Sequence, residues 1–183
     1  MIKWPFIEDL EGAAITVGYV PLGQSGHPLG KSGVTIASGV DLGQRSVAAW
    51  QRLGIHDLTL ELIEPYCGAK GDAALRLLDA RPLELSEAHV RELDNCLRDE
   101  FLRSLSARWG RDSADDWDGL DDRQQTVVMS VAWQYGRPWD HCPTFWGCAT
   151  SGDWAGVVAE LRNFGDAYPT RRGKEADYLE ALR

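Results

Sequence analysis

Residues 11–43 read EGAAITVGYVPLGQSGHPLGKSGVTIASGVDLG, and they decide the fold of this chain. Two stretches rich in Thr, Val and Ile, residues 15–22 and 33–40, flank a segment rich in Gly, Pro and Ser that shows no apolar periodicity. β-Branched residues favour strands, whereas Gly, Pro and Ser favour turns. The pattern therefore predicts a β-hairpin with an elongated tip, bounded by one acidic residue on each side, Glu11 and Asp41.

The residues before the hairpin are predicted to form a short amphipathic helix. Trp4, Ile7 and Leu10 recur at the three-to-four spacing of one helix face, and Gly12 is suited to end the helix. Glu11 therefore lies where this helix gives way to the hairpin. An acid at a helix C-terminus is disfavoured by the helix dipole, so its presence there calls for another explanation.

The residues after the hairpin are predicted to be helical almost throughout. The longest predicted helix covers residues 86–109, and an apolar helix follows the capping-box pattern of Asp121 and Gln124. We expect an α+β fold in a single domain, residues 1–183. A small N-terminal sheet lobe, about residues 12–43, is expected to pack on a larger helical lobe, about residues 44–183. A cleft between two such lobes suits a polymer ligand.

The composition is that of a globular, acidic protein. The chain has 183 residues, 44% of them hydrophobic, and a formal net charge of −9. This length and hydrophobicity allow a compact domain with a substantial core. The negative charge argues against a nucleic-acid-binding protein, which needs a basic face.

The sequence carries no signal for a metal, a cofactor or a membrane span. Cys67, Cys96, Cys142 and Cys148 form no CxxC pair, and the four histidines lack ligand spacing, so we expect neither metal nor cofactor. We expect reduced thiols, with a Cys142–Cys148 bridge as the alternative. No apolar run reaches the ~20 residues of a membrane span. Residues 1–12 lack the apolar core of a signal peptide.

Glu11 and Asp41 are the candidate catalytic residues, because a pair of carboxylates is what a glycosidase uses to cut a sugar polymer. A general acid must carry a proton before it acts, and burial among apolar neighbours favours the protonated form. The apolar neighbours of Glu11 are Leu10, Ala13, Ala14 and Ile15. Asp41 follows a strand and precedes a helix, a position where Asp also commonly serves as an N-cap. Thr35 suits a strand, and its hydroxyl is able to position a water.

This block resembles the pesticin-type muramidases, which are related to the phage-type, T4-like lysozymes. The shared pattern is a Glu that closes a first helix, a TVGY strand, and the stretch GVTIASGVDLG. The resemblance implies that Glu11 is the catalytic acid and that Thr35 and Asp41 complete the active site. Phage lysozymes proper carry their Asp before the strand, whereas this chain has no acid within residues 12–40. Ala37, where many relatives have Gly, is a mild departure.

Two later segments extend the resemblance. The sequence SVAWQYG, residues 130–136, is similar to the central helix of phage lysozymes. That makes Gln134 a candidate sugar contact, although an ordinary helix-end amide would look the same. The tail is similar to the closing helices of that fold, where an Arg after a Pro pairs with the catalytic Glu. Arg171 is the best match and Arg172 the second, with surface arginines at a helix start as the alternative.

The resemblance implies an enzyme that hydrolyses the β-1,4 bond between N-acetylmuramic acid and N-acetylglucosamine in peptidoglycan. Glu11 would protonate the leaving oxygen, and Asp41 would activate a water or stabilise the oxocarbenium-like transition state, with Thr35 helping to hold the water. Analogy with the phage enzymes favours inversion, for which the carboxyl groups stand ~6.5–9.5 Å apart. The alternatives are an inactive module of the same fold that binds glycan or protein, and a chitinase.

The expected setting is an antibacterial toxin domain, a secretion-system effector or a phage lysin. We expect the chain to be made in the cytoplasm without a signal peptide. It would then act on the peptidoglycan glycan strand in the periplasm of a target cell. Its negative charge gives no long-range attraction to anionic wall polymers, so we expect a delivery module or fused domain. An immunity or inhibitor protein is a further expected partner, whereas nucleic acid is not.

Overall fold

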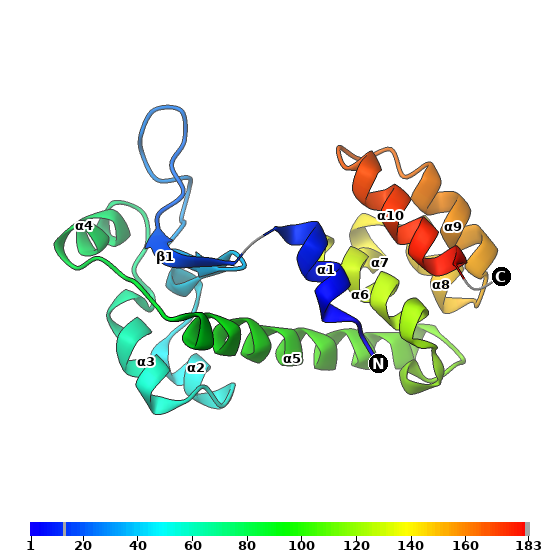
Figure 1. The fold of residues 1–183 in the computed structure, drawn as a ribbon, viewed down its shortest axis with the longest axis horizontal. Coiled ribbons are helices and arrows are strands. Elements are labelled where there is room, and N and C mark those ends of the chain that lie inside the picture. Colours follow the sequence, from blue (N-terminus) through cyan, green and yellow to red (C-terminus); the bar gives the residue numbers. More distant parts are fainter. Residues whose placement is uncertain (13, 182–183) are drawn as a thin grey trace. The chain divides into compact units, whose positions relative to one another are not determined.

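The structure, a computed structural model, describes residues 1–12 and 14–181 (Figure 1). It has an α+β fold, as the sequence predicts. The strands are β1 (Ile15–Tyr19), β2 (Thr35–Ala37) and β3 (Val40–Asp41). The helices are α1 (Trp4–Glu11), α2 (Val47–Arg52), α3 (Asp57–Ile63), α4 (Asp72–Ala80), α5 (Glu87–Asp112), α6 (Asp122–Tyr135), α7 (Pro138–His141), α8 (Pro143–Thr150), α9 (Trp154–Arg162) and α10 (Pro169–Glu180). Short 3-10 turns are η1 (Leu42–Gln44), η2 (Glu64–Tyr66) and η3 (Trp117–Gly119).

The chain forms two compact units. The first combines Met1–Glu11 with Phe101–Arg183, and the second is Gly12–Glu100. This division differs from the lobe boundary expected near residue 43, because α2, α3 and α4 belong with the sheet. The physical reason is a shared core in which Trp50 and Ile63 are buried together with Ile36 of the sheet. Helix α5 contributes to both cores, with Leu93 in one and Leu105 in the other.

The second unit contains a three-stranded antiparallel sheet in the order β1-β2-β3. Ile15 lies opposite Ala37, and Tyr19 lies opposite Thr35, with an irregularity between these pairs. Thr35 in turn lies opposite Asp41. The pairing of β2 with β3 therefore places two of the candidate site residues directly across from each other.

The second predicted strand, residues 33–40, is instead two short strands separated by a turn at Ser38 and Gly39. Ala37 adopts a φ of 57° and Gly39 a φ of 88°, both in the left-handed region that interrupts a strand. Asp94 fixes this turn by accepting hydrogen bonds from the Ser38 N–H at 3.2 Å and from its hydroxyl at 2.8 Å. The conformation of Ala37 explains why Gly suits this position.

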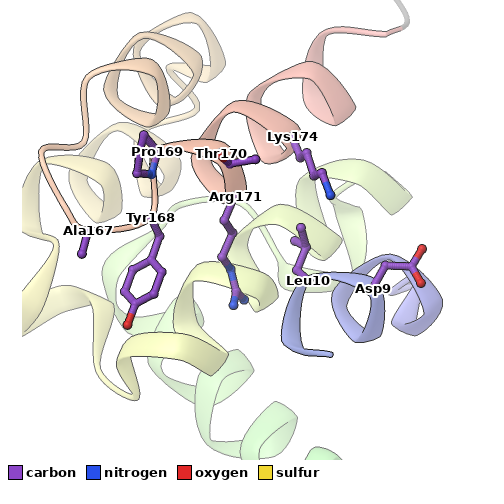
Figure 2. Close-up of a pocket in the computed structure, with 8 residues that line it drawn as sticks. All are labelled: Asp9, Leu10, Ala167, Tyr168, Pro169, Thr170, Arg171 and Lys174. Carbon is purple, nitrogen blue, oxygen red and sulfur yellow. The ribbon is translucent and has the colours of Figure 1, made fainter. Parts of the chain in front are cut away.

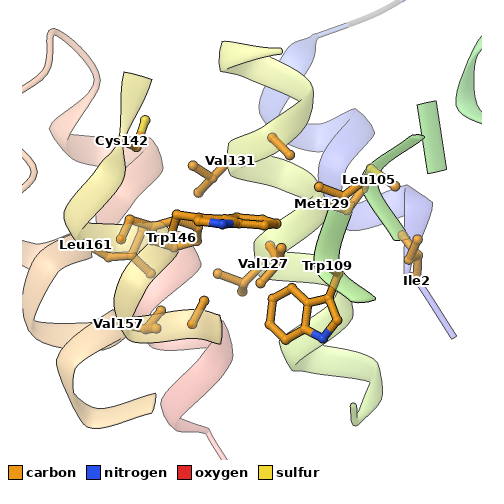
Figure 3. Close-up of a cluster of buried hydrophobic side chains, with 14 of the residues drawn as sticks. Ile2, Leu105, Trp109, Val127, Met129, Val131, Cys142, Trp146, Val157 and Leu161 are labelled. Atoms are coloured by element: carbon orange, nitrogen blue, oxygen red, sulfur yellow. The ribbon is translucent and has the colours of Figure 1, made fainter. Parts of the chain in front are cut away.

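The core of the first unit is built around α6. This helix starts at the predicted capping box, in which the Asp121 side chain accepts from the Gln124 N–H and the Gln124 side chain accepts from the Asp121 N–H. Residues 125–132 of the helix are all buried. Figure 3 shows side chains from neighbouring helices, among them Trp109, Trp146 and Leu161, gathered around it.

Helix α1 packs into this same core. Ile7 is fully buried there. Trp4 meets the edge of Trp133 with ring centroids 5.8 Å apart, and Phe6 stacks on Tyr178 at 4.2 Å. These contacts place the C-terminal end of α1, and therefore Glu11, beside helices from the other end of the chain.

Three further features complete the fold. The short helix α7, which the sequence analysis did not predict, begins with Pro138 at its first position. The four cysteines are all unbridged, so the alternative Cys142–Cys148 disulfide is not formed. Within residues 1–12 and 14–181, no helix combines the length and the hydrophobicity needed to cross a bilayer.

Candidate active site

Glu11 is the last residue of α1, and its carboxylate is paired with Arg171 of α10. The distance between Glu11 Oε1 and Arg171 Nη1 is 2.6 Å. The Glu11 side chain is 30% exposed, and that of Arg171 is 10% exposed. The expected pairing of Arg171 with Glu11 is therefore present, and the second choice, Arg172, has other partners. Arg171 is thus a charged neighbour of the Glu11 carboxylate. Ala13, one of the apolar neighbours expected from the sequence, lies outside the described residues.

The Arg171 guanidinium is fixed by three further hydrogen bonds. Its Nε donates to Glu175 Oε1 at 3.2 Å. Its Nη2 donates to the Ser130 carbonyl at 3.1 Å and to the Ser130 hydroxyl at 3.2 Å. Because all three nitrogens are engaged, the guanidinium presents one fixed edge to Glu11.

Glu175 is a fully buried carboxylate at the centre of this network. It accepts a hydrogen bond from the Ser130 hydroxyl at 2.5 Å and forms ion pairs with Arg171 and Arg172. Burial raises the pKa of Glu175, and the charge of Arg172, the Ser130 hydroxyl and Arg171 all oppose that rise.

Arg172 is buried and links Glu175 to Asp166 and Gln134. Its Nε donates to Asp166 Oδ2 at 3.1 Å, and its Nη2 donates to the Gln134 side-chain oxygen. Its guanidinium also lies 4.8 Å from the centre of the Phe164 ring. Gln134, the candidate sugar contact, is therefore half-buried with its amide oxygen already bonded within the protein.

Asp166 ends this chain of alternating charges. Burial alone would raise the pKa of Asp166, but hydrogen bonds from the Tyr135 hydroxyl and the Tyr168 N–H, together with the charge of Arg172, lower it overall. Burial and the bond to Asp166 raise the pKa of Tyr135 far above its ordinary value. Tyr135 therefore acts as a hydrogen-bond donor to Asp166 at 2.7 Å.

A surface pocket opens beside Arg171 within the first unit. Its volume is about 350 Å³. It is lined by Asp9, Leu10, Ala167, Tyr168, Pro169, Thr170, Arg171 and Lys174. Figure 2 shows the Arg171 side chain extending between Tyr168 on one side and Leu10 on the other. The pocket combines an aromatic ring, a hydroxyl, a carboxylate and two cations, a mixture that suits a polar ligand.

Asp41 lies in the second unit, where it is held chiefly by the backbone. Its Oδ1 accepts from the N–H groups of Gly33 at 3.0 Å and Gly43 at 2.9 Å. Its Oδ2 lies 3.1 Å from the Gly33 nitrogen and accepts from Gln44 Nε2 at 3.0 Å. Asp41 is the N-cap of η1, so the capping role considered from the sequence is present.

Two glycines are required by this arrangement. A Cβ on Gly33 would lie 2.5 Å from Asp41 Oδ1, and a Cβ on Gly43 would lie 2.3 Å from the Ala69 carbonyl oxygen. Neither distance is possible for real atoms without a shift of the backbone. The sequence gives Gly33 and Gly43 as members of the motif, but their close approach to Asp41 is visible only in the structure.

Thr35 lies next to this carboxylate but is buried, at 5% exposure. Its hydroxyl donates to the Gly33 carbonyl at 3.4 Å, while the Gly33 N–H donates to Asp41. Gly33 thus connects the two candidate residues. Within the part of the chain that the structure describes, no cluster of three or more His, Cys, Asp and Glu residues could hold a metal ion.

A family model described as pesticin, a bacterial toxin homologue of phage lysozyme, C-terminal domain, matches residues 1–155. The chain belongs to the pesticin family. The α+β architecture with its small antiparallel sheet is accordingly lysozyme-like, as the sequence predicts. A search of the curated proteins finds no match for the chain.

The predicted site residues fall into two sets, one in each unit. Glu11, Arg171 and, through Arg172, Gln134 are brought together in the first unit, and Thr35 and Asp41 in the second. The family match includes Glu11, Thr35, Asp41 and Gln134, whereas Arg171 lies beyond residue 155. Their chemical roles remain predictions.

Sequence analysis missed three partners of the two arginines: the buried Ser130 and Glu175, and the half-buried Asp166. One signal was available, because Arg171 and Glu175 are four residues apart on a predicted helix and therefore share a face. That spacing is far more common on solvent-exposed helix faces, so it gave no indication that Glu175 is buried.

Proposed function

We propose that this member of the pesticin family is a muramidase that hydrolyses the β-1,4 bond between N-acetylmuramic acid and N-acetylglucosamine in peptidoglycan. The observation that carries the proposal is the ion pair between Glu11, at the end of α1, and Arg171, in a chain whose family contains homologues of phage lysozyme. Glu11 is the proposed general acid, which protonates the leaving oxygen as the glycosidic bond breaks.

Asp41 is the proposed second carboxylate. It activates a water or stabilises the oxocarbenium-like transition state, and Thr35 helps to position that water. Donors surround both Asp41 oxygens, an arrangement that suits a carboxylate, which only accepts hydrogen bonds. By analogy with the phage enzymes we propose inversion, which the anomeric form of the first product reveals.

Gln134 and Arg171 are proposed to contribute to substrate binding. Arg171 borders the surface pocket described above, and Gln134 lies near the C-terminal end of the central helix α6. We further propose that the domain acts as an antibacterial toxin, effector or lysin in the periplasm of a target cell. A delivery module or fused domain would carry it there, and an immunity protein is a proposed partner.

The test is digestion of purified peptidoglycan by the wild-type protein and by Glu11→Gln and Asp41→Asn, with products identified by mass spectrometry. A muramidase releases muropeptides with a reducing N-acetylmuramic acid end, and neither variant should produce them. Circular dichroism and thermal unfolding establish that each variant is folded.

Other outcomes would change the proposal. If folded wild-type protein releases no products but binds glycan, a catalytically inactive binding module replaces the enzyme. Cleavage of chitin in preference to peptidoglycan would favour a chitinase. Full activity in folded Asp41→Asn would remove Asp41 from the mechanism and leave it as an N-cap.

A further inference from the structure

The Arg171 guanidinium contacts Glu11 with one nitrogen and is bonded to Glu175 and Ser130 through the other two. Nη1 faces the Glu11 carboxylate at 2.6 Å, whereas Nε and Nη2 are bound by Glu175 and Ser130. With only its contact to Glu11, a long Arg side chain would sample several rotamers. The bonds to Glu175 and Ser130 remove that freedom.

Burying the Glu175 carboxylate costs free energy of folding, which suggests a role other than stability. It is fully buried, and a buried ionised carboxylate is expensive to remove from water unless good partners compensate it. Its Oε1 accepts from Ser130 and Arg171, and its Oε2 accepts from Arg172. An apolar residue of the same volume would fill the space at less expense, but it would leave the Nε of Arg171 without a partner.

We propose that Glu175 is a positioning residue for the reaction: through Arg171 it fixes the place of the Glu11 carboxylate. This inference rests on the proposed function, in which Glu11 is the general acid. Glu175 is bonded to Arg171, Arg172 and Ser130, and of these three Arg171 is the residue paired with Glu11, so the effect of Glu175 on the acid passes through Arg171. Proton transfer needs the acid within hydrogen-bond reach of the leaving oxygen, so a loose Arg171 slows the chemical step.

A double-mutant cycle on turnover tests this role. The four proteins are the wild type, Glu175→Gln, Arg171→Met and the double variant, with kcat and KM measured on soluble, uncross-linked glycan strands. We expect Glu175→Gln to lower kcat about tenfold when Arg171 is present, and any rise in KM to be smaller than this fall, because Arg171 also borders the proposed binding pocket. In the Arg171→Met background the same change should alter kcat by less than about twofold, because the residue through which Glu175 acts is gone.

A matched control separates positioning from loss of stability. Asp112 is also a carboxylate with an Arg partner and one further donor: Arg108 Nε lies 2.6 Å and Trp146 Nε1 2.8 Å from its Oδ2. Asp112→Asn should lower the melting temperature and leave kcat unchanged. If Glu175→Gln folds poorly, Ser130→Ala removes a smaller group that bonds both Glu175 and Arg171, and it should lower kcat in the same Arg171-dependent way.

The outcomes are distinct. An equal effect of Glu175→Gln with and without Arg171, or unchanged kcat in folded Glu175→Gln, overturns the inference while the muramidase stands. Inactive wild-type protein overturns the proposed function instead. In that case a crystal structure of Glu175→Gln still decides the positioning claim, since an unmoved Arg171 guanidinium would contradict it.

Discussion

The two carboxylates of the proposed site are held by opposite means. Glu11 is fixed by side chains, through Arg171 and then the buried Glu175 and Ser130. Asp41 is fixed mainly by backbone N–H groups, at a point where two glycines approach too closely for any side chain. In the first case the position depends on the chemistry of distant residues, and in the second on the path of the chain itself.

This difference predicts different responses to substitution. The Glu11 carboxylate can be neutralised with little effect on the fold, because its partner Arg171 keeps its contacts to Glu175 and Ser130. A carboxylate that accepts several backbone N–H groups is part of the fold, so neutralising it leaves donors unsatisfied. The four predictions below test that contrast in order of decreasing effect.

The largest effect is expected for Glu11→Gln. Glu11 is the proposed general acid, so its replacement should lower kcat about 10²–10⁴-fold. The unfolding free energy should change by less than about 1 kcal/mol, because Glu11 is partly exposed and Arg171 retains Glu175 and Ser130. Turnover of peptidoglycan and urea unfolding measure the two quantities, and a fall of several kcal/mol in stability would erase the contrast with Asp41.

Gly43→Ala should damage the backbone support of Asp41. The added Cβ would lie 2.3 Å from the Ala69 carbonyl oxygen and 2.8 Å from Gly33 Cα, so we expect a loss of about 3 kcal/mol in unfolding free energy. The control is Gly110→Ala in α5, where an added Cβ meets nothing within 4 Å and Ala is the better helix former. Equal stability of the two variants would show that the chain path near Asp41 adapts easily.

Asp41→Asn sharpens the comparison at the carboxylate itself. The NH₂ group of an Asn faces the Gly33 and Gly43 N–H groups in one orientation and Gln44 Nε2 in the other. In the second orientation relief requires Gln44 to turn its own amide, whose oxygen now accepts from Lys70 Nζ. We expect a loss of about 1–3 kcal/mol in unfolding free energy, in contrast to Glu11→Gln. Asp153→Asn is the matched control, because Asp153 is an N-cap whose side chain accepts one backbone N–H, which Asn does equally well.

The smallest effect concerns an exposed ion pair in the same unit as Glu11. A hydrogen bond from Lys3 at 2.7 Å is the main cause that lowers the pKa of Asp122 to about 2. A lowered pKa stabilises the folded state above the ordinary value of 3.8, and this contribution is lost as the pH falls towards 2. Asp122→Asn should therefore be slightly less stable than wild type at pH 7, and the difference should vanish near pH 2 in thermal melts. A difference that persists at pH 2 or in high salt would point to a non-electrostatic cause.

Local patterns in the sequence were sufficient to predict much of the fold. Turn chemistry and β-branched residues marked the hairpin, and the Asp121–Gln124 pattern marked the start of α6. The break at Ala37 was not predictable in the same way, because an Ala gives no sign that its backbone is left-handed. The grouping of Met1–Glu11 with Phe101–Arg183 depends on long-range packing that no local pattern indicates, such as the bond from the Lys3 N–H to Thr126, 123 positions apart.

The candidate site was predictable where resemblance supplied the chemistry, as for the pairing of Arg171 with Glu11. The buried partner of Arg171, Glu175, was not predictable in this way. Glu175 sits among polar residues in sequence, so its complete burial results from how α10 packs, and no local pattern encodes it.

The membership of α1 in the first unit also bears on the order of folding. Residues 12–100 are contiguous, so the sheet unit can form as soon as it has left the ribosome. Helix α1 is made earlier, but α6 and α10, against which it packs, come later. Contacts that close so long a loop are expected to form more slowly than local ones. We therefore expect the Glu11–Arg171 pair to form after the contacts within residues 12–100, which pulse-labelling hydrogen exchange during refolding would show as later protection of α1 than of the sheet.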